Sequence, residues 1–166
     1  MLNTIYQSDQ QRTVLEQQKS RCDRRTKHPV VVIVEHDPAV LELMKEVLQA
    51  EGYTIHGFID HYGQAAVIQQ ICPDLVILEA HPRFTNTPVA MIRQLRGNER
   101  LRATPIIIDS TDRRLLESVM MSLDNQRCYT FEKPFDSDCF LQCVQSVIGI
   151  ARKDSRANAS VYKGQE

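Results

Sequence analysis

Three short runs of apolar residues in the chain contain no polar position. They are Val30–Val34, Leu75–Leu78 and Pro105–Ile108. Unbroken apolar runs of this length are typical of strands that are buried on both faces, as in a parallel sheet. Two weaker strands are predicted at Tyr53–Phe58 and Cys128–Phe131, where β-branched and aromatic residues are frequent.

Segments with the apolar spacing of helices separate these strands. After the first strand, Asp37 and Pro38 form a helix start, and Gly52 marks the end of that helix. Further helices are predicted at 63–71, 88–96, 113–123 and 136–150. Five strands that alternate with five helices indicate a three-layer α/β fold, in which helices cover both faces of a doubly wound, five-stranded parallel sheet.

The two ends of the chain lack this pattern. Residues 1–28 carry six basic and three acidic residues, and residues 152–166 carry four and two. We expect two mobile polar tails, with a short helix over Leu15–Lys19, around one domain at 29–151. The basic run of the first tail offers a contact for an acidic partner.

Charge and hydropathy exclude some classes of partner. Residues 29–151 contain ten basic and sixteen acidic residues, so the folded part is not expected to bind nucleic acid. No apolar stretch approaches the roughly 18 residues of a membrane span, and MLNTIYQSDQQRT has no apolar signal block. We therefore expect a cytoplasmic protein with no membrane contact, in which the five cysteines are thiols. Cys139 and Cys143, one helical turn apart, are assigned to packing.

Side chains capable of chemistry follow four of the predicted strands. In a doubly wound parallel sheet, ligands bind beyond the carboxyl ends of the strands. Each of these residues has a structural explanation on its own, such as a helix cap or a solvated cation. Together they indicate a site: Glu35, His36 and Asp37; Glu79; Asp109 and Ser110; and Lys133.

Four stretches resemble, in order and spacing, the receiver domain of bacterial two-component response regulators. They are VVIVEHDPAVLELMKEVLQAEGY, PDLVILE, TPIIIDS and EKPFD, and the resemblance covers Pro29–Ile150. It implies the flavodoxin-like fold of the CheY-like superfamily. It also implies a phosphorylation switch, in which an acidic pair holds Mg²⁺, an Asp accepts phosphoryl from a histidine kinase, and a hydroxyl and a Lys contact that group.

The resemblance assigns a role to each residue by position. Glu35 and His36 stand at the acidic pair, Glu79 at the phosphoacceptor, and Ser110 and Lys133 at the phosphate contacts. The aromatic switch position is occupied by Thr130, and Tyr129 before it faces the other side of the strand. Asp109 and Thr111 crowd the same corner, and the loop His81–Thr87 is one residue longer than is common.

Two of these substitutions alter the chemistry itself. Glu79 carries its carboxylate about 1.5 Å farther from the backbone than an Asp would, in a reaction that needs in-line approach. His36 replaces a carboxylate ligand of Mg²⁺, which prefers oxygen. We therefore expect a degenerate receiver with no cofactor and with weak Mg²⁺ binding at most, through Glu35, Glu79 and His81.

Other uses of these residues remain open. Glu79 could reach Lys133 and partly imitate a phosphorylated Asp, or it could belong to a simple ion cluster. His36 and His81 with the two glutamates could hold Zn²⁺.

The leading functional hypothesis is a non-enzymatic, stand-alone receiver that signals by protein contact without phosphorylation. Its expected docking face is formed by the helix at 113–123, the strand at 128–131 and the helix at 136–150, and its partner is a histidine kinase, an output protein or a second copy. The alternatives are a working phosphorelay receiver, in which His36 or Glu79 accepts phosphoryl, and a small carboxylate-based phosphatase.

Overall fold

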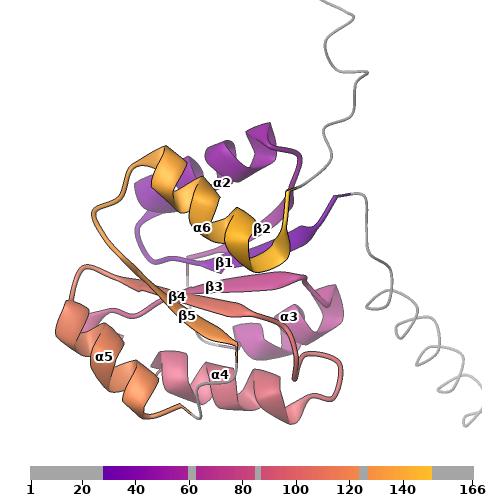
Figure 1. Cartoon of the computed structure of the whole chain (residues 1–166). Helices are drawn as coiled ribbons and strands as arrows, with labels where there is room; N and C mark the ends of the chain where they lie inside the picture. The colour runs from indigo at the N-terminus through magenta and orange to yellow at the C-terminus, as the bar shows by residue number, and fades with distance from the viewer. Residues whose placement is uncertain (1–27, 60–62, 85–86, 124–126, 151–166) are drawn as a thin grey trace, which may run out of the picture.

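The computed structural model describes residues 28–59, 63–84, 87–123 and 127–150. Within these residues, five parallel strands form one sheet in the order β2-β1-β3-β4-β5 (Figure 1). The strands are β1 Val30–Val34, β2 Thr54–Phe58, β3 Leu75–Glu79, β4 Ile106–Ser110 and β5 Cys128–Glu132. This is the predicted fold class.

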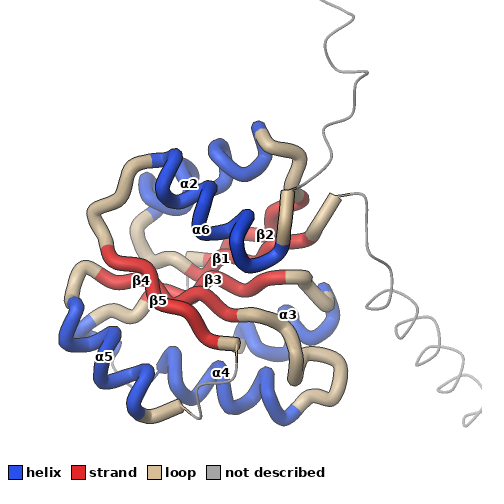
Figure 2. The backbone as a smooth tube through the Cα atoms, viewed as in Figure 1, coloured by secondary structure: helices blue, strands red, loops and turns tan. Residues whose placement is uncertain are grey.

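Helices cover both faces of the sheet, which gives three layers (Figure 2). α2 and α6 lie on one face, and α3, α4 and α5 lie on the other. A short 3₁₀ helix, η1, falls in the segment that was expected to be a loop. The bounds are α2 Pro38–Ala50, α3 Gln64–Ile71, η1 Pro82–Phe84, α4 Thr87–Gly97, α5 Arg113–Met121 and α6 Ser137–Ile148.

The central strands are apolar up to their carboxyl ends because each face of the sheet has its own core. In β1, Val31 and Ile33 pack toward α2 and α6, whereas Val32 and Val34 pack toward α3, α4 and α5. All four side chains are fully buried. The outer strands β2 and β5 are half-exposed, which explains their weaker apolar pattern.

Aspartates begin three of the helices. The Asp37 carboxylate accepts hydrogen bonds from the backbone N–H groups of Ala39 and Val40, at 2.8 and 3.3 Å. Asp112 and Asp136 cap α5 and α6 in the same way. Asp37 is therefore the helix cap that its position before Pro38 predicts.

Some expectations differ from the structure or lie outside it. The tails at 1–27 and 151–166, with the helix over Leu15–Lys19, are outside the described residues. α6 ends at Ile148, two residues earlier than predicted, because Gly149 adopts a positive φ of 83°. Among the described residues, no helix is long and apolar enough to cross a membrane.

The expectation that every cysteine is a thiol is wrong for Cys72, which is disulfide-bonded. A disulfide depends on closeness in space, which the spacing of cysteines along this chain does not reveal. Cys128, Cys139 and Cys143 are free. Cys143 packs against the core between the sheet and α6, as expected, but Cys139 in the first turn of α6 is exposed.

Candidate functional site

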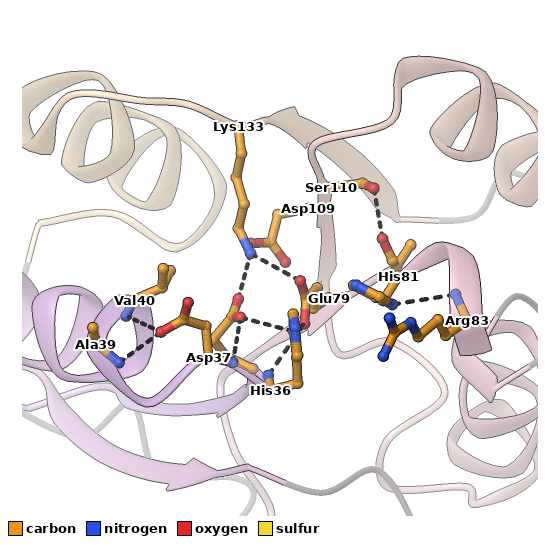
Figure 3. A network of polar contacts seen from close by, with 12 residues as sticks. His36, Asp37, Ala39, Val40, Glu79, His81, Arg83, Asp109, Ser110 and Lys133 are labelled. Atoms are coloured by element: carbon orange, nitrogen blue, oxygen red, sulfur yellow. Dashed lines mark hydrogen bonds and ion pairs between the residues drawn. The ribbon is translucent and has the colours of Figure 1, made fainter.

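The carboxyl ends of four strands bring one group of charged side chains together. Glu35 follows β1, Glu79 ends β3, Asp109 lies in β4 opposite Glu79, and Lys133 follows β5. Sheet-like hydrogen bonds continue past two of these ends, from Glu35 N–H to Phe58 O (2.9 Å) and from Lys133 N–H to Ser110 O (2.8 Å). The backbone of the sheet therefore fixes where these side chains start (Figure 3).

Lys133 is the cation at the centre of the group. Its Nζ atom pairs with Glu35 Oε2 and lies 2.9 Å from Asp109 Oδ2 and 3.4 Å from Glu79 Oε1. The side chain is only 8% exposed. Burial opposes its charge, but the attraction of Asp109 and Glu35 outweighs burial and raises the pKa of Lys133 above its ordinary value. Lys133 is therefore a permanent buried cation.

His36 contacts the same two glutamates from the opposite side. Its Nδ1 atom contacts Glu79 Oε2 and lies 3.4 Å from Glu35 Oε1, and its backbone N–H donates to Glu79 Oε2 at 3.1 Å. Each glutamate thus directs one oxygen to Lys133 and the other to His36. We call this closed set of Glu35, His36, Glu79 and Lys133 the strand-end ring (Figure 3).

The acidic groups around Lys133 outnumber it three to one. Burial outweighs the hydrogen bond from Lys133 and raises the pKa of Glu35 to about 7. Burial also raises the pKa of Asp109, whose Oδ1 atom has no hydrogen-bond partner among the described residues. Burial alone would raise the pKa of Glu79 too, but hydrogen bonds from His36 and the charge of Lys133 lower it. The three carboxyl groups therefore differ in pKa, which is raised for Glu35 and Asp109 and lowered for Glu79.

Ser110 does not face this group. Its hydroxyl is fully buried, donates to Ala80 O at 2.5 Å and accepts a hydrogen bond from Asp112 N–H at 3.1 Å. Both contacts belong to the β3 and β4 termini. The residue at the predicted phosphate-contact position is thus held by backbone groups.

The expected metal set differs from the group that the structure assembles. Among the described residues, Glu35, His36 and Glu79 place ligand atoms within 4.8 Å of one another, and His81 is not part of that set. The ring of His81 packs beside that of His36, with centroids 4.4 Å apart. Its Nδ1 atom accepts a hydrogen bond from Arg83 N–H at 3.2 Å (Figure 3). η1, which the sequence did not predict, supplies that contact.

The two residues of β5 near the switch position lie on opposite faces, as predicted. Thr130 is in register with Ile108, which packs toward α5, and Tyr129 is in register with Ile107, which packs toward α6. Thr130 lines a surface hollow with residues of α5 and with the end of β5: Arg113, Leu116, Glu117, Met120 and Glu132.

Asp109 is a site residue whose role the sequence did not reveal. It was expected to crowd the corner beside Ser110, but it is a third carboxylate partner of Lys133 and is 1% exposed. The available signal was its position as the acidic residue directly after the apolar run of β4. Its role required the register that places it opposite Glu79.

Solved structures similar to this chain include a chemotaxis protein, a receiver domain and a response regulator. The chemotaxis protein CheY4 of Vibrio cholerae superposes with a TM-score of 0.63 at 18% identity, covering 72% of this chain and 98% of that one. The chain has the fold of a response-regulator receiver domain. The receiver domain of the sensor histidine kinase PA1611 of Pseudomonas aeruginosa, solved with magnesium in its active-site cleft, gives a TM-score of 0.62 at 18% identity, covering 73% and 98%.

Sequence comparison finds similarity to a curated transcriptional regulator. The DNA-binding dual master transcriptional regulator RpaA of Synechocystis is 26% identical over 121 residues, which is 72% of this chain and 49% of RpaA. This receiver-like chain therefore spans about half the length of that relative. No family model matches the chain.

The PA1611 receiver domain holds a magnesium ion in its active-site cleft, but the strand-end residues of this chain are a poor fit to that ion. Mg²⁺ takes oxygen ligands in near-octahedral geometry. His36 brings a nitrogen to this position and already contacts both glutamates that would serve as ligands. No step of the proposed function therefore depends on magnesium.

Proposed function

We propose that the protein is an atypical receiver in two-component or phosphorelay-type signal transduction, which acts by protein contact and without phosphorylation. The observation that carries this proposal is the engagement of both carboxylate oxygens of Glu79. Oε2 contacts His36 twice, and Oε1 lies 3.4 Å from Lys133. A carboxylate that is held on both oxygens is poorly placed for in-line attack on a phosphoryl donor.

Two further features support a site without phosphoryl chemistry. Glu79 is one methylene longer than the Asp at this position in the family, which moves the acceptor oxygen by about 1.5 Å. Ser110, which would contact a phosphoryl group, is bound to Ala80 O instead. The Glu79–Lys133 contact resembles the contact expected of a phosphorylated Asp. This supports a domain that stays in one conformation without phosphorylation.

The proposed docking face consists of α5, β5 and α6. Met121 at the end of α5 is 89% exposed and Tyr129 in β5 is 43% exposed, so apolar area is available there. We propose a protein partner on this face, either a histidine kinase or an output protein, with a second copy of this chain as the alternative. The excess of acidic residues in 29–151 supports a partner other than nucleic acid. We also propose that the protein is not an enzyme and that it acts in the cytoplasm.

Acetyl phosphate with Mg²⁺, followed by intact mass, tests the absence of phosphorylation. We expect the wild-type mass to stay unchanged. The matched control is the double variant Glu79→Asp with His36→Asp, which restores the acceptor and the acidic pair while Lys133 and Ser110 stay in place. We expect this variant to gain one phosphoryl group. A stoichiometric gain on the wild-type protein would overturn the proposal in favour of a working phosphorelay receiver.

A further inference from the structure

We propose that residues 14–22 of this chain dock in a surface hollow beside α3, and that a disulfide between Cys22 and Cys72 holds them there. The hollow lies at the β2 edge of the sheet, whereas the docking face proposed above lies at the opposite edge, at β5 (Figure 1). The inference is therefore independent of the proposed function. It rests on the state of the cysteines, on the course of the chain before β1 and on the lining of the hollow.

The cysteines identify both ends of the disulfide by elimination. The chain contains five cysteines, and three of them, Cys128, Cys139 and Cys143, are free. Cys72 is half-buried at the end of α3 and is disulfide-bonded. Cys22, which lies outside the described residues, is the one cysteine that is left in the chain. We therefore assign Cys22 as the partner of Cys72.

The chain enters β1 next to the end of α3. Asp74 N–H donates to Val30 O at 2.8 Å, and Val30 N–H donates to the Asp74 carboxylate at 2.7 Å. Cys72 is two residues before Asp74, and Cys22 is eight residues before Val30. Eight extended residues span about 26–29 Å, whereas the Cα atoms of a disulfide lie about 5.5–6 Å apart. The chain before β1 is therefore long enough to turn back and reach Cys72.

A hollow lies between this point and the outer strand β2. It has a volume of about 310 Å³ and is lined by Val30, His56, Val67, Gln70 and Ile71. His56 is in register with Val32, which packs toward α3, so the hollow is on the face of the sheet that α3 covers. Because Ile71 directly precedes Cys72, a segment that is bonded to Cys72 starts at the wall of the hollow.

The lining of the hollow suits apolar side chains. It contains no Asp, Glu, Lys or Arg, and Val67 is 38% exposed. Val67 is five residues before Cys72, about 8 Å along the axis of α3. In the proposed segment, the adjacent apolar pair Val14 and Leu15 comes seven to eight residues before Cys22, so the pair can reach Val67. Burial of these apolar surfaces favours the docked position.

The disulfide makes the docking depend on redox conditions. A dithiol reductant gives two electrons and two protons to the bond, which yields two thiols while the dithiol itself becomes a disulfide. The closed bond keeps the segment at high local concentration beside the hollow. Once the bond is open, a few apolar contacts must offset the whole conformational entropy of the segment. We therefore expect reduction to release it.

Peptide mapping without reductant tests the disulfide. The full chain, kept in air, is alkylated in denaturant and digested with trypsin. We expect a peptide pair that joins residues 22–24 to residues 46–83, and a dithiol should abolish it. Cys128→Ser is the control, since Cys128 is free, and should keep the pair. Alkylation of both Cys22 and Cys72 would overturn the proposal, and so would a dimer on a non-reducing gel, because it would assign the bond to two copies.

Amide hydrogen exchange tests the docking itself. We expect α3 to exchange at least about threefold more slowly in the oxidised wild type than in Cys22→Ser, because the segment covers it. Val67→Lys should lose this protection with the disulfide intact. Leu43→Lys, at a residue of α2 that is 43% exposed, is the matched control and should keep it. Circular dichroism checks that all variants fold.

Two results of the exchange experiment would contradict the docking. One is equal exchange of α3 in the oxidised wild type and in Cys22→Ser. The other is full protection in Val67→Lys, which would show that the bond alone slows exchange. Either result would leave the hollow to a different occupant, such as a separate protein.

Discussion

At the scale of single residues, Lys133 determines whether three carboxylates can share one small volume. It is the cation that Glu35, Asp109 and Glu79 have in common, and it is almost completely buried. A buried carboxylate without a partner costs several kcal/mol, because its charge loses the solvation of water. The arrangement at the strand ends therefore depends on this one side chain more than on any of the acids.

We expect Lys133→Met to lower the free energy of unfolding at pH 8 by about 3–5 kcal/mol. The substitution keeps the aliphatic stem and removes only the charge that pairs with the three carboxylates. Urea unfolding followed by circular dichroism measures the effect. Lys45→Met is the control, since Lys45 forms a surface pair with Glu42 at 2.7 Å, and should cost less than about 1 kcal/mol. Equal losses in the two variants would contradict this view of the site.

At the scale of elements, the Arg96 side chain links α4 to the connection that leads into β4. From the last turn of α4, its guanidinium Nη1 donates to Leu101 O at 3.1 Å and to Thr104 O at 2.6 Å. Both carbonyl groups lie in the connection from α4 to β4. Because β4 carries Asp109 and Ser110, the contact helps to set the position of the strand that contributes two residues to the strand ends.

We expect Arg96→Met to destabilise the fold by about 1–3 kcal/mol, because it leaves carbonyl groups of the connection without their charged donor. Arg93→Met is the control. Arg93 is an exposed residue of the same helix, and its replacement should change stability by less than about 0.5 kcal/mol. Thermal unfolding of both variants measures the difference. A loss at Arg93 as large as that at Arg96 would show that the helix, and not the carbonyl contacts, is responsible.

The elements could be predicted from sequence more fully than the site could. Unbroken apolar runs revealed β1, β3 and β4, because a strand covered on both faces is apolar over most of its length. The roles of Asp109 and His81 could not be read in this way. Asp109 became a partner of Lys133 only through the register of β4 against β3, and η1 determined the contact of His81 with Arg83. Both depend on tertiary placement, which local patterns do not encode.

At the scale of the whole molecule, the stability of the fold should depend on pH through Glu35. Folding raises the pKa of this carboxyl from 4.5 to about 7, with burial as the main cause. Below 4.5 the group is protonated in both the folded and unfolded states. Between these values the folded state keeps a proton that the unfolded chain releases, so stability falls as pH rises. Above 7 the full cost, about 3 kcal/mol, is present.

We therefore expect Glu35→Gln to gain stability relative to the wild type as pH rises from about 4.5 to about 7, because glutamine does not titrate. Urea unfolding of both proteins in metal-free buffer measures this difference. The other titratable groups that face Glu35, namely Lys133, Asp109 and His36, are common to both proteins. Glu42→Gln, on the exposed face of α2, should run parallel to the wild type. Parallel curves for Glu35→Gln would refute the expectation.

The closed form of the strand-end ring has a consequence for how such a chain can change over evolutionary time. Each member contacts two others, so replacing Lys133 or His36 alone leaves oxygens of both buried glutamates without that partner. We therefore expect substitutions at these four positions to occur in pairs, so that a lineage that replaces His36 also replaces one of the glutamates that it contacts. Aligned descendants of this chain would record paired exchanges there, with few intermediates.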